Sequence, residues 1–401
     1  MKKIKILRII ARLNIGGPAI HTILLTQGLD KSRFESLLVC GNIDKDEGDM
    51  SYYAEEKKVK PIFIPELRRK LSLASDIAAL IKIYKIIKAE QPDIIHTHTA
   101  KAGALGRLSG ILYNLLHPKS GKQIRLIHTF HGHVLEGYFN KLKTRIFIFI
   151  ERFLAIFTSR IITVSESVKN ELMALRICKP EKINVIPLGF ELDNFFKIPL
   201  IDKPALNIGI VGRLVPIKNH RLFLEAAAKV ISDNPGMGLR FKIVGDGELR
   251  QILEEYSRKL NIDGQVDLLG WQKDLVNVYT NLDIVALTSL NEGTPVSLIE
   301  AMACSKAVVA TDVGGVRDLL GDEVNAGIRP DADFKALERG IIVKPQDSFS
   351  FAAAMNFMLR NTAVRKNMAE KARNFAKEKF TKERLIEDME NLYSVMLGYH
   401  P

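Results

Sequence analysis

The sequence predicts an α/β protein with two successive parallel β-sheets, each covered by helices on both faces. Short apolar runs rich in β-branched residues alternate with amphipathic helical stretches along the chain, as in parallel sheets with helical crossovers. The alternation breaks near residue 190 and then restarts. With 401 residues, 47% of them hydrophobic, the chain is long enough to bury two cores.

The first half of the chain contains seven apolar runs of strand length, with helical patterns at Ala19–Leu29 and Ile77–Glu90 between them. The predicted strands are Ile4–Ile10, Ser36–Cys40, Ile62–Ile64, Ile94–His96, Arg125–Thr129, Ile161–Val164 and Ile183–Ile186. Parallel strands need crossover connections of this kind, so we predict one open sheet for residues 1–190.

The second half follows a break at Pro187-Leu188-Gly189 and an irregular stretch at Phe190–Pro204. Its predicted strands are Ala205–Val211, Arg240–Val244, Val266–Leu269, Ile284–Thr288, Ala307–Ala310 and Ile341–Val343. Ligands of open α/β sheets bind at the carboxyl ends of the strands, so two such sheets can form a cleft between those ends.

Positive charge is concentrated in the first half, within an overall formal charge of +12. Residues 1–190 carry 31 Lys and Arg against 17 Asp and Glu, whereas residues 191–401 carry 27 against 29. An anionic partner for the first half is one interpretation, with nucleic acid and anionic lipid as candidates. A basic surface that only keeps the protein soluble is the other.

The sequence favours a cytoplasmic protein. Basic residues interrupt the apolar N-terminus, which argues against a signal peptide, and charged residues interrupt the most apolar stretch, Ile146–Ile162. The three cysteines, Cys40, Cys178 and Cys304, are too scattered for a disulfide framework or a metal site, as expected in a reducing compartment.

The first strand runs into a glycine turn, Asn14-Ile15-Gly16-Gly17-Pro18, before a predicted helix. Gly16 and Gly17 allow close approach of the backbone to a ligand, and Pro18 suits the first turn of a helix. Free amides at such a helix start attract phosphate or sugar hydroxyls. A plain tight turn explains the glycines equally well, and the pattern is neither a dinucleotide-binding motif nor a Walker A loop.

The strand that opens the second sheet ends in a loop with two cations, Arg213 and Lys218. A departing diphosphate builds up negative charge in the transition state, and fixed cations stabilise that charge without a metal ion. Taken alone, the pair would be ordinary surface cations. A second motif in the same half of the chain favours the ligand-binding interpretation.

The second motif extends from Glu292 to Glu300 and follows another predicted strand. Thr294 is a good N-cap and Pro295 a good first helical residue, so we expect a helix to begin there. Glu292 would precede the helix and Glu300 would lie about two turns inside it, so one carboxylate can contact sugar hydroxyls and the other a ribose diol. The backbone amides free at this helix start would be those of Thr294, Val296 and Ser297.

At these motifs the chain resembles the retaining glycosyltransferases of family 4, which have the GT-B architecture of two Rossmann-like domains facing across a cleft. The resemblance covers essentially the whole chain. The segments that carry it are Gly16-Gly17, Gly212-Arg213-Leu214 to Lys218-Asn219, Glu292-Gly293-Thr294-Pro295 to Glu300-Ala301, and Asp312-Val313-Gly314-Gly315-Val316-Arg317-Asp318.

The resemblance implies a domain layout and a reaction. Residues 1–190 would form an acceptor-side domain, residues 191–381 a nucleotide-sugar-binding domain, and residues 382–401 a helix that crosses back to the first domain. The enzyme would move a hexose or an N-acetylhexosamine, with retention, from a nucleotide diphosphate sugar, expected to be a UDP-sugar. The acceptor would be a glycan or a lipid-linked molecule in cell-surface polysaccharide synthesis, and neither a metal nor a further cofactor is expected.

The resemblance also implies the roles of individual residues. Arg213 and Lys218 would hold the diphosphate, Glu300 the ribose, and Glu292 the hydroxyls of the donor sugar. His131, in Thr129-Phe130-His131-Gly132-His133, matches the family histidine that lies against the donor sugar. His131, Glu292, Arg213 and Lys218 would thus be the catalytic group. The other donor-binding residues would be Gly16, Gly17, Gly293, Thr294 and Val296.

His96 and His98 also end a predicted strand. No third residue with metal-ligand spacing lies near them in the sequence, so we interpret them as cleft-lining or structural residues rather than zinc ligands.

Three alternatives stay open. A metal-dependent GT-A transferase needs an Asp-x-Asp motif, but Asp44-Lys45-Asp46 and Asp331-Ala332-Asp333 lie in hydrophilic loops typical of solvated turns. A GT-B sugar-nucleotide epimerase or phosphorylase would share the cleft, and an epimerase would turn over its UDP-sugar without an acceptor. A non-enzymatic nucleic-acid-binding protein would use the basic half, although no nucleic-acid motif supports it.

For the basic half we favour an anionic membrane surface over nucleic acid. Leu67-Arg68-Arg69-Lys70-Leu71 and Lys141–Ile150 combine cations with large apolar groups, which is typical of interfacial segments. A basic edge beside a buried helix is the alternative. We therefore expect a protein that is peripheral on the cytoplasmic face of a membrane.

Overall fold

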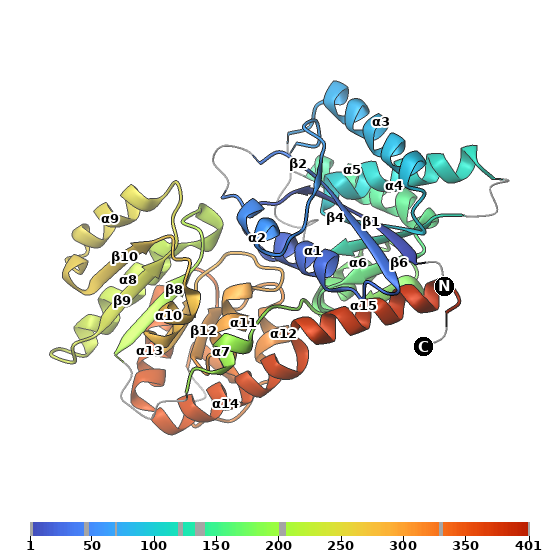
Figure 1. The fold of residues 1–401 in the computed structure, drawn as a ribbon. Coiled ribbons are helices and arrows are strands. Elements are labelled where there is room, and N and C mark those ends of the chain that lie inside the picture. The colour runs from blue at the N-terminus through green and yellow to red at the C-terminus, as the bar shows by residue number, and fades with distance from the viewer. Residues whose placement is uncertain are drawn as a thin grey trace. The chain divides into compact units, whose positions relative to one another are not determined.

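The computed structural model divides into two compact units, Met1–Phe190 with Lys382–Pro401 and Glu191–Thr381 (Figure 1). It describes residues 3–43, 48–68, 70–118, 123–132, 141–199, 206–328 and 332–399, without the side chains of residues 141–143. The triplet Asp44-Lys45-Asp46 lies outside the described residues, as do Arg69, His133 and Asp331.

The first unit is built on a seven-stranded sheet in which all neighbouring strands are parallel. Its strands are β1 (Ile4–Arg12), β2 (Phe34–Gly41), β3 (Ile62–Phe63), β4 (Ile94–His98), β5 (Arg125–Phe130), β6 (Arg160–Thr163) and β7 (Ile183–Val185). Its helices are α1 (Gly17–Gly28), α2 (Ser51–Glu56), α3 (Leu73–Glu90), α4 (Ala100–Leu116), α5 (Lys141–Phe157), α6 (Glu166–Ala174), the 3₁₀ helix η1 (Pro180–Lys182) and α15 (Lys382–Met396).

The strand order of this sheet, β3-β2-β1-β4-β5-β6-β7, reverses between β1 and β4. Ile6 of β1 lies opposite Ile94 of β4, and Ile10 lies opposite His98. At such a reversal the connections leave on opposite sides of the sheet, so the following loops leave space for a ligand at the carboxyl ends. The glycine turn after β1 and the histidine that ends β4 therefore belong to one edge of the sheet.

The second unit repeats this plan, in the order β10-β9-β8-β11-β12-β14-β13 with the reversal between β8 and β11. Its strands are β8 (Asn207–Val211), β9 (Arg240–Val244), β10 (Val266–Gly270), β11 (Ile284–Leu287), β12 (Ala307–Thr311), β13 (Phe334–Leu337) and β14 (Gly340–Val343). Its helices are α7 (Asp193–Phe196), η2 (Pro216–Lys218), α8 (His220–Asp233), α9 (Arg250–Lys259), η3 (Asp263–Gln265), α10 (Leu275–Thr280), α11 (Val296–Ala303), α12 (Val316–Leu320), α13 (Ser348–Arg360) and α14 (Thr362–Lys379).

The predicted α/β class and parallel sheets are confirmed, and each predicted strand ends within two residues of an observed one. The prediction differs from the structure in two of its details. Helix α7 lies in the stretch predicted to be irregular, and β13 is an edge strand antiparallel to β14. The short run Phe334–Leu337 has a charged residue in its middle and only two buried side chains, so it carries little hydrophobic periodicity.

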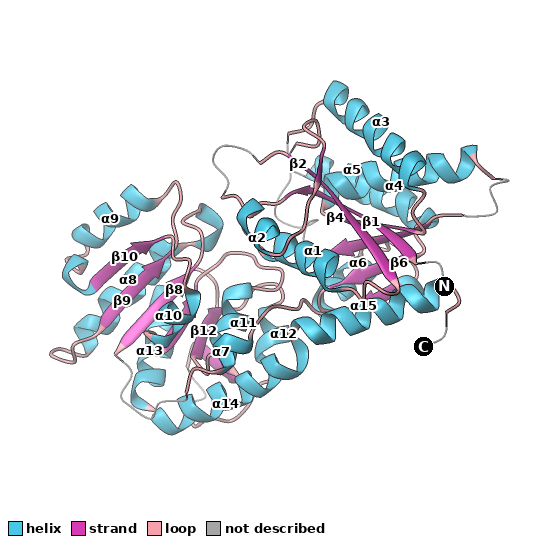
Figure 2. Ribbon diagram, viewed as in Figure 1, coloured by secondary structure: helices cyan, strands magenta, loops and turns pink. Residues whose placement is uncertain are grey.

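Helices cover both faces of the first sheet (Figure 2). Alternate residues of β1 point to opposite faces, and Leu7 packs with α3 and α4 while Ile6 packs with α1 and α15. Three residues of α15 are buried in that second core: Leu385, Met389 and Tyr393. The C-terminal helix is thus part of the first unit. No helix among the described residues combines the length and apolar character needed to cross a bilayer.

Candidate active site

The turn after β1 places Gly16 directly before α1. Its φ of 152° is a conformation that side chains rarely adopt, which accounts for a glycine there. The Gly16 carbonyl accepts hydrogen bonds from the amides of Ala19 and Ile20, and so starts the helix. Gly17 is the buried first residue of α1. The amino end of α1 is therefore held at the carboxyl edge of the first sheet.

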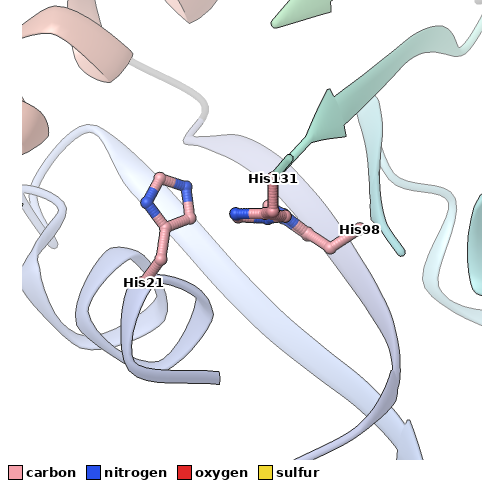
Figure 3. A group of neighbouring side chains, drawn as sticks. All are labelled: His21, His98 and His131. Atoms are coloured by element: carbon pink, nitrogen blue, oxygen red, sulfur yellow. The ribbon is translucent and has the colours of Figure 1, made fainter. Parts of the chain in front are cut away.

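Three histidines meet at the same edge, from three different elements (Figure 3). His21 lies in α1, His98 ends β4 and His131 follows β5. His98 Nδ1 is 3.0 Å from His131 Nε2, and the ring centroids of His21 and His131 are 5.0 Å apart. The predicted donor-sugar residue His131 therefore belongs to a cluster of imidazoles.

The cluster is uncharged, because burial disfavours the charged form of an imidazole. Burial lowers the pKa of His131 to about 3, and burial, followed by the neighbouring histidines and then Arg8, lowers the pKa values of His21 and His98 well below their usual range. Four ring nitrogens lack a hydrogen-bond partner among the described residues: His21 Nδ1 and Nε2, His98 Nε2 and His131 Nδ1. A buried polar atom without a partner costs about 1–3 kcal/mol, so this arrangement disfavours the ligand-free fold.

His96 differs from these three, because both of its ring nitrogens have partners. They lie 2.7 Å from the Tyr393 hydroxyl and 2.7 Å from Thr129 Oγ1. Arg8, fully buried in β1, also donates to the Tyr393 hydroxyl at 3.3 Å. His96 thus helps to attach α15 to the sheet, in line with a structural role. His98, in contrast, has a third partner in the cluster, His21 from α1, which the spacing of residues in the sequence does not reveal.

In the second unit the predicted cations follow β8. Gly212 and Arg213 leave the strand, and the 3₁₀ helix η2 ends at Lys218. Asn219 then takes a left-handed conformation, with φ 48°, and turns the chain into α8. Within the part of the chain that the structure describes, no carboxylate pairs with Arg213. Its charge is therefore available to an anion.

Lys218 and Glu292 connect the loop after β8 to the loop after β11. Lys218 Nζ donates to Glu292 Oε1 at 2.5 Å, and the two side chains are only 23% and 11% exposed. Ser289 Oγ donates to the same oxygen at 2.6 Å, and the Leu290 amide donates to the Ile217 carbonyl at 2.8 Å. The reversal of strand order makes β8 and β11 neighbours, so these two loops lie side by side.

Helix α11 begins one residue later than predicted, at Val296. Pro295 is the N-cap residue, with φ −71° and ψ 113°, and Thr294 does not cap the helix with its side chain. Instead Thr294 Oγ1 is buried without a partner among the described residues. The first bond to the Pro295 carbonyl comes from Leu298, so the earlier amides of Val296 and Ser297 stay available to a ligand. Gly293 lies in the loop before Thr294, and its carbonyl accepts from the Gly315 amide at 3.0 Å.

Glu300 is held by a tyrosine that the sequence analysis missed. The buried Tyr279 hydroxyl donates to Glu300 Oε2 at 2.9 Å and also lies 3.0 Å from the Ser297 carbonyl. Burial raises the pKa of Glu300 to about 7, and the hydrogen bond from Tyr279 opposes that rise. Burial and the nearby Glu300 raise the pKa of Tyr279 well above its usual range.

A second feature missed by the sequence analysis is Gly245-Asp246-Gly247, the turn after β9. The Gly212 amide donates to the Val244 carbonyl, and the Leu214 amide donates to the Asp246 carbonyl, both at 2.9 Å. Gly245 has a φ of 132°, and a Cβ there would lie 2.0 Å from the Gly212 carbonyl oxygen. The sequence signal that could have revealed this turn is the pair of glycines directly after β9, the strand beside β8.

Comparison with known proteins identifies the family. Residues 15–194 match the family described as Glycosyltransferase Family 4, and residues 192–375 match Glycosyl transferases group 1. The chain is 30% identical to the UDP-Gal:alpha-D-GlcNAc-diphosphoundecaprenol alpha-1,3-galactosyltransferase of Escherichia coli, over 92% of this chain and 91% of that protein. This chain belongs to the group 1, family 4 glycosyltransferases.

Two further similarities agree with this assignment. The capsular polysaccharide biosynthesis glycosyltransferase CapM of Staphylococcus aureus is 25% identical, over 82% of this chain and 84% of that protein. The crystal structure of Anabaena Alr3699/HepE in complex with UDP superposes with a TM-score of 0.77 at 20% identity, over 98% of this chain and 100% of that one. The fold is therefore that of the GT-B glycosyltransferases, as the sequence predicted, and the protein is a glycosyltransferase.

The raised pKa of Glu300 predicts how stability depends on pH. The folded state binds this proton more tightly than the unfolded state, because the folded pKa is about 7 against an ordinary 4.5. The free energy of unfolding should therefore fall by about 1.4 kcal/mol for each pH unit between these values, and Glu300→Gln should lack this contribution. Urea unfolding from pH 5 to 8 measures it, and parallel curves for the two proteins would show that Glu300 titrates normally.

Proposed function

We propose that this glycosyltransferase moves a hexose or an N-acetylhexosamine from a UDP-sugar, with retention of configuration, to a sugar carried on a lipid diphosphate. The name of the Escherichia coli relative, which specifies a UDP-galactose donor and a diphosphoundecaprenol-linked acceptor, supports this donor and acceptor. Galactose is accordingly the first sugar to test. The product would serve cell-surface polysaccharide synthesis, to which the name of CapM also refers.

The observation that carries the proposal is the set of charged groups at the carboxyl ends of β8 and β11. Arg213 has no carboxylate partner among the described residues, while Lys218 has one, Glu292. Two cations there suit a diphosphate, whose negative charge grows as the sugar leaves. The amides of Val296 and Ser297, at the amino end of α11, add donors for the same phosphate groups.

Two carboxylates would bind the other parts of the donor: Glu300 the ribose and Glu292 the transferred sugar. Glu300 lies in α11 with a raised pKa, so a ribose diol that donates to its carboxylate would displace a proton when the nucleotide binds. Glu292 precedes α11 and would accept from hydroxyls of the sugar, with Gly293 and Thr294 beside it. Lys218 holds the Glu292 carboxylate in one orientation, as a group that stabilises positive charge at the anomeric carbon requires.

His131 and the glycine turn are the proposed contributions of the first unit. A neutral imidazole can donate one hydrogen bond to a sugar hydroxyl and accept another, and His131 Nδ1 has no partner among the described residues. Gly16 and Gly17 would bring backbone amides to the donor. In this proposal the leaving phosphate itself helps to deprotonate the acceptor, so the protein supplies positioning and charge rather than a separate base.

Transfer should survive EDTA, because Arg213 and Lys218 take the place of a metal on the diphosphate. The assay follows labelled galactose from UDP-galactose onto a lipid-diphosphate-linked N-acetylglucosamine, with GDP- and ADP-sugars as competing donors. Lys218→Ala should lower turnover about 10²-fold in that assay while the fold stays intact. Loss of activity in EDTA with rescue by Mn²⁺, or normal turnover of the variant, would contradict the proposed leaving-group chemistry.

Glu292→Gln should lower turnover by roughly 10²–10³-fold, or about 3–4 kcal/mol, with UDP affinity little changed. The amide keeps the size of the side chain but removes the charge that stabilises the transition state. Glu300→Gln is the matched control, because the same change there should weaken UDP binding directly. Calorimetry with UDP and turnover with the donor separate the two effects, and full activity of Glu292→Gln would rule out the assigned role.

A membrane-facing surface is the second part of the proposal, and helix α5 carries it. Its inner side chains, including Leu154, are buried, whereas an outer row is exposed: Ile146, Phe149, Phe153, Ile156 and Phe157. These positions recur at helical spacing, with Arg145 and Arg152 exposed among them. An apolar helix face flanked by cations matches the chemistry of an anionic bilayer surface.

The neighbouring helices also expose apolar residues. Helix α3 packs on α4, and α4 packs on α5. Exposed apolar residues of α3, α4 and the loop before α3 are Leu71, Leu73, Ile77, Ile81, Leu112, Leu115 and Leu116. Leu67 is fully buried, so of the apolar residues predicted at Leu67–Leu71 only Leu71 is exposed. We place the enzyme on the cytoplasmic face of the membrane, in line with its free cysteines.

The protein should therefore bind vesicles that contain phosphatidylglycerol and leave them as salt rises, since each cation near such a surface contributes about 1 kcal/mol. Phe149→Ser should weaken vesicle binding by roughly tenfold without changing UDP affinity. The matched control is Phe349→Ser, because Phe349 of α13 is 75% exposed and Phe149 is 72% exposed. Equal effects of the two substitutions, measured by sedimentation with vesicles, would exclude the α5 face.

A further inference from the structure

We propose that His21, His98 and His131 together bind a divalent transition-metal ion of the Zn²⁺ class. One ring nitrogen from each residue lies within 4.8 Å of those of the other two (Figure 3). Imidazole is a preferred ligand of Zn²⁺, Co²⁺, Ni²⁺ and Cu²⁺, and three imidazoles with an open fourth position form a known type of zinc site. The cluster lies wholly within the first unit.

The distances are close to those that a metal requires. Metal–nitrogen bonds of 2.0–2.1 Å in a tetrahedral site place the ligand nitrogens about 3.3 Å apart. His98 Nδ1 and His131 Nε2 are already 3.0 Å apart, so a small separation of the rings admits an ion between them. His21 has no hydrogen bond from either ring nitrogen to the described residues, and it can turn toward the ion without losing a contact of that kind.

The protonation states also suit a metal. Burial keeps all three rings neutral, and the neutral imidazole is the form that ligates metals. In the ligand-free protein one ring of the His98–His131 pair must donate to the other. For both of these nitrogens to bind an ion, the ring protons must lie on His98 Nε2 and His131 Nδ1. Those are the nitrogens without a partner among the described residues, so no existing hydrogen bond prevents this shift.

Charge limits the affinity and the choice of ion. The positive charges of Arg8 and Arg384 act on His21, and no carboxylate of the described residues contributes to the pKa shifts of the three rings. We therefore expect weaker binding than at a structural cysteine–histidine zinc site. Ions high in the Irving–Williams order should bind, whereas Mg²⁺ and Mn²⁺, which prefer oxygen ligands, should not. His131 is the partly exposed member of the cluster, so water can take the fourth position.

This site does not depend on the function proposed for His131. Transfer without a metal requires only that the diphosphate be neutralised by Arg213 and Lys218, and metal binding can be measured in the absence of any donor sugar. Activity in EDTA therefore tests the leaving-group chemistry, and metal titration tests the histidine cluster.

The experiment is a titration of the full-length, metal-stripped protein with Co²⁺, followed by its visible absorption, and then by displacement with Zn²⁺. We expect one Co²⁺ per chain with the intense band of four-coordinate cobalt. His21→Gln and His98→Gln should each weaken binding by at least about tenfold, since even second-shell losses around a metal cost 10–100-fold. Circular dichroism and thermal unfolding check that the first unit of each variant, which holds the cluster, is folded.

His117→Gln is the matched control, because His117 lies at the end of α4, outside the cluster, and its Nδ1 is 3.0 Å from the Tyr113 carbonyl. This variant should bind Co²⁺ like the wild type. A wild-type protein that takes up no Co²⁺, or Co²⁺ binding that survives both His21→Gln and His98→Gln in folded protein, would overturn the proposal. Equal loss in His117→Gln would also do so.

Discussion

The arrangement of both units depends on a reversal of strand order beside the first strand of each sheet. In the first unit the chain adds β2 and β3 on one side of β1 and then β4 to β7 on the other, and the second unit does the same around β8. Because parallel crossovers are right-handed, the two sets of helices cover opposite faces of the sheet. Free space therefore lies beside the loops that follow the strands at each reversal. Almost every proposed ligand-binding residue lies in or next to these loops.

The two units supply different chemistry at these equivalent places. The first offers uncharged imidazoles that burial keeps neutral. The second offers cations and carboxylates, of which Lys218 and Glu292 form a largely buried pair. A pair of this kind adds little to stability once its desolvation is counted, but it fixes the position of both charges before a substrate arrives. In the proposed mechanism, charge stabilisation in the transition state requires charged groups that are ordered before the ligand binds.

Helix α5 packs into the core on one side and carries the proposed membrane-facing surface on the other. Its buried side holds Leu154 against the first sheet, and its opposite side exposes Phe149 and Ile156. Because both sides of the helix are apolar, its sequence lacks the usual alternation between a buried apolar face and a solvated polar face. The helix therefore appears in the sequence only as an interrupted apolar stretch. In the proposed membrane docking, the basic excess of residues 1–190 would complement the negative charge of an anionic bilayer.

The sequence alone determined the α/β class, the break near residue 190, most strands and the local motifs, since periodicity, turn residues and cations after strands depend on neighbours in the chain. It placed the start of α11 one residue early, because Thr294 and Pro295 satisfy helix-start preferences equally well in either register. It missed β13, because this strand has little hydrophobic periodicity of its own and is held by its pairing with β14. Only the tertiary structure decided that Tyr279 would hold Glu300 and that His21 would join His98 and His131. Those contacts join residues far apart in the chain. They arise from the order in which the strands pair, and local sequence patterns do not indicate that order.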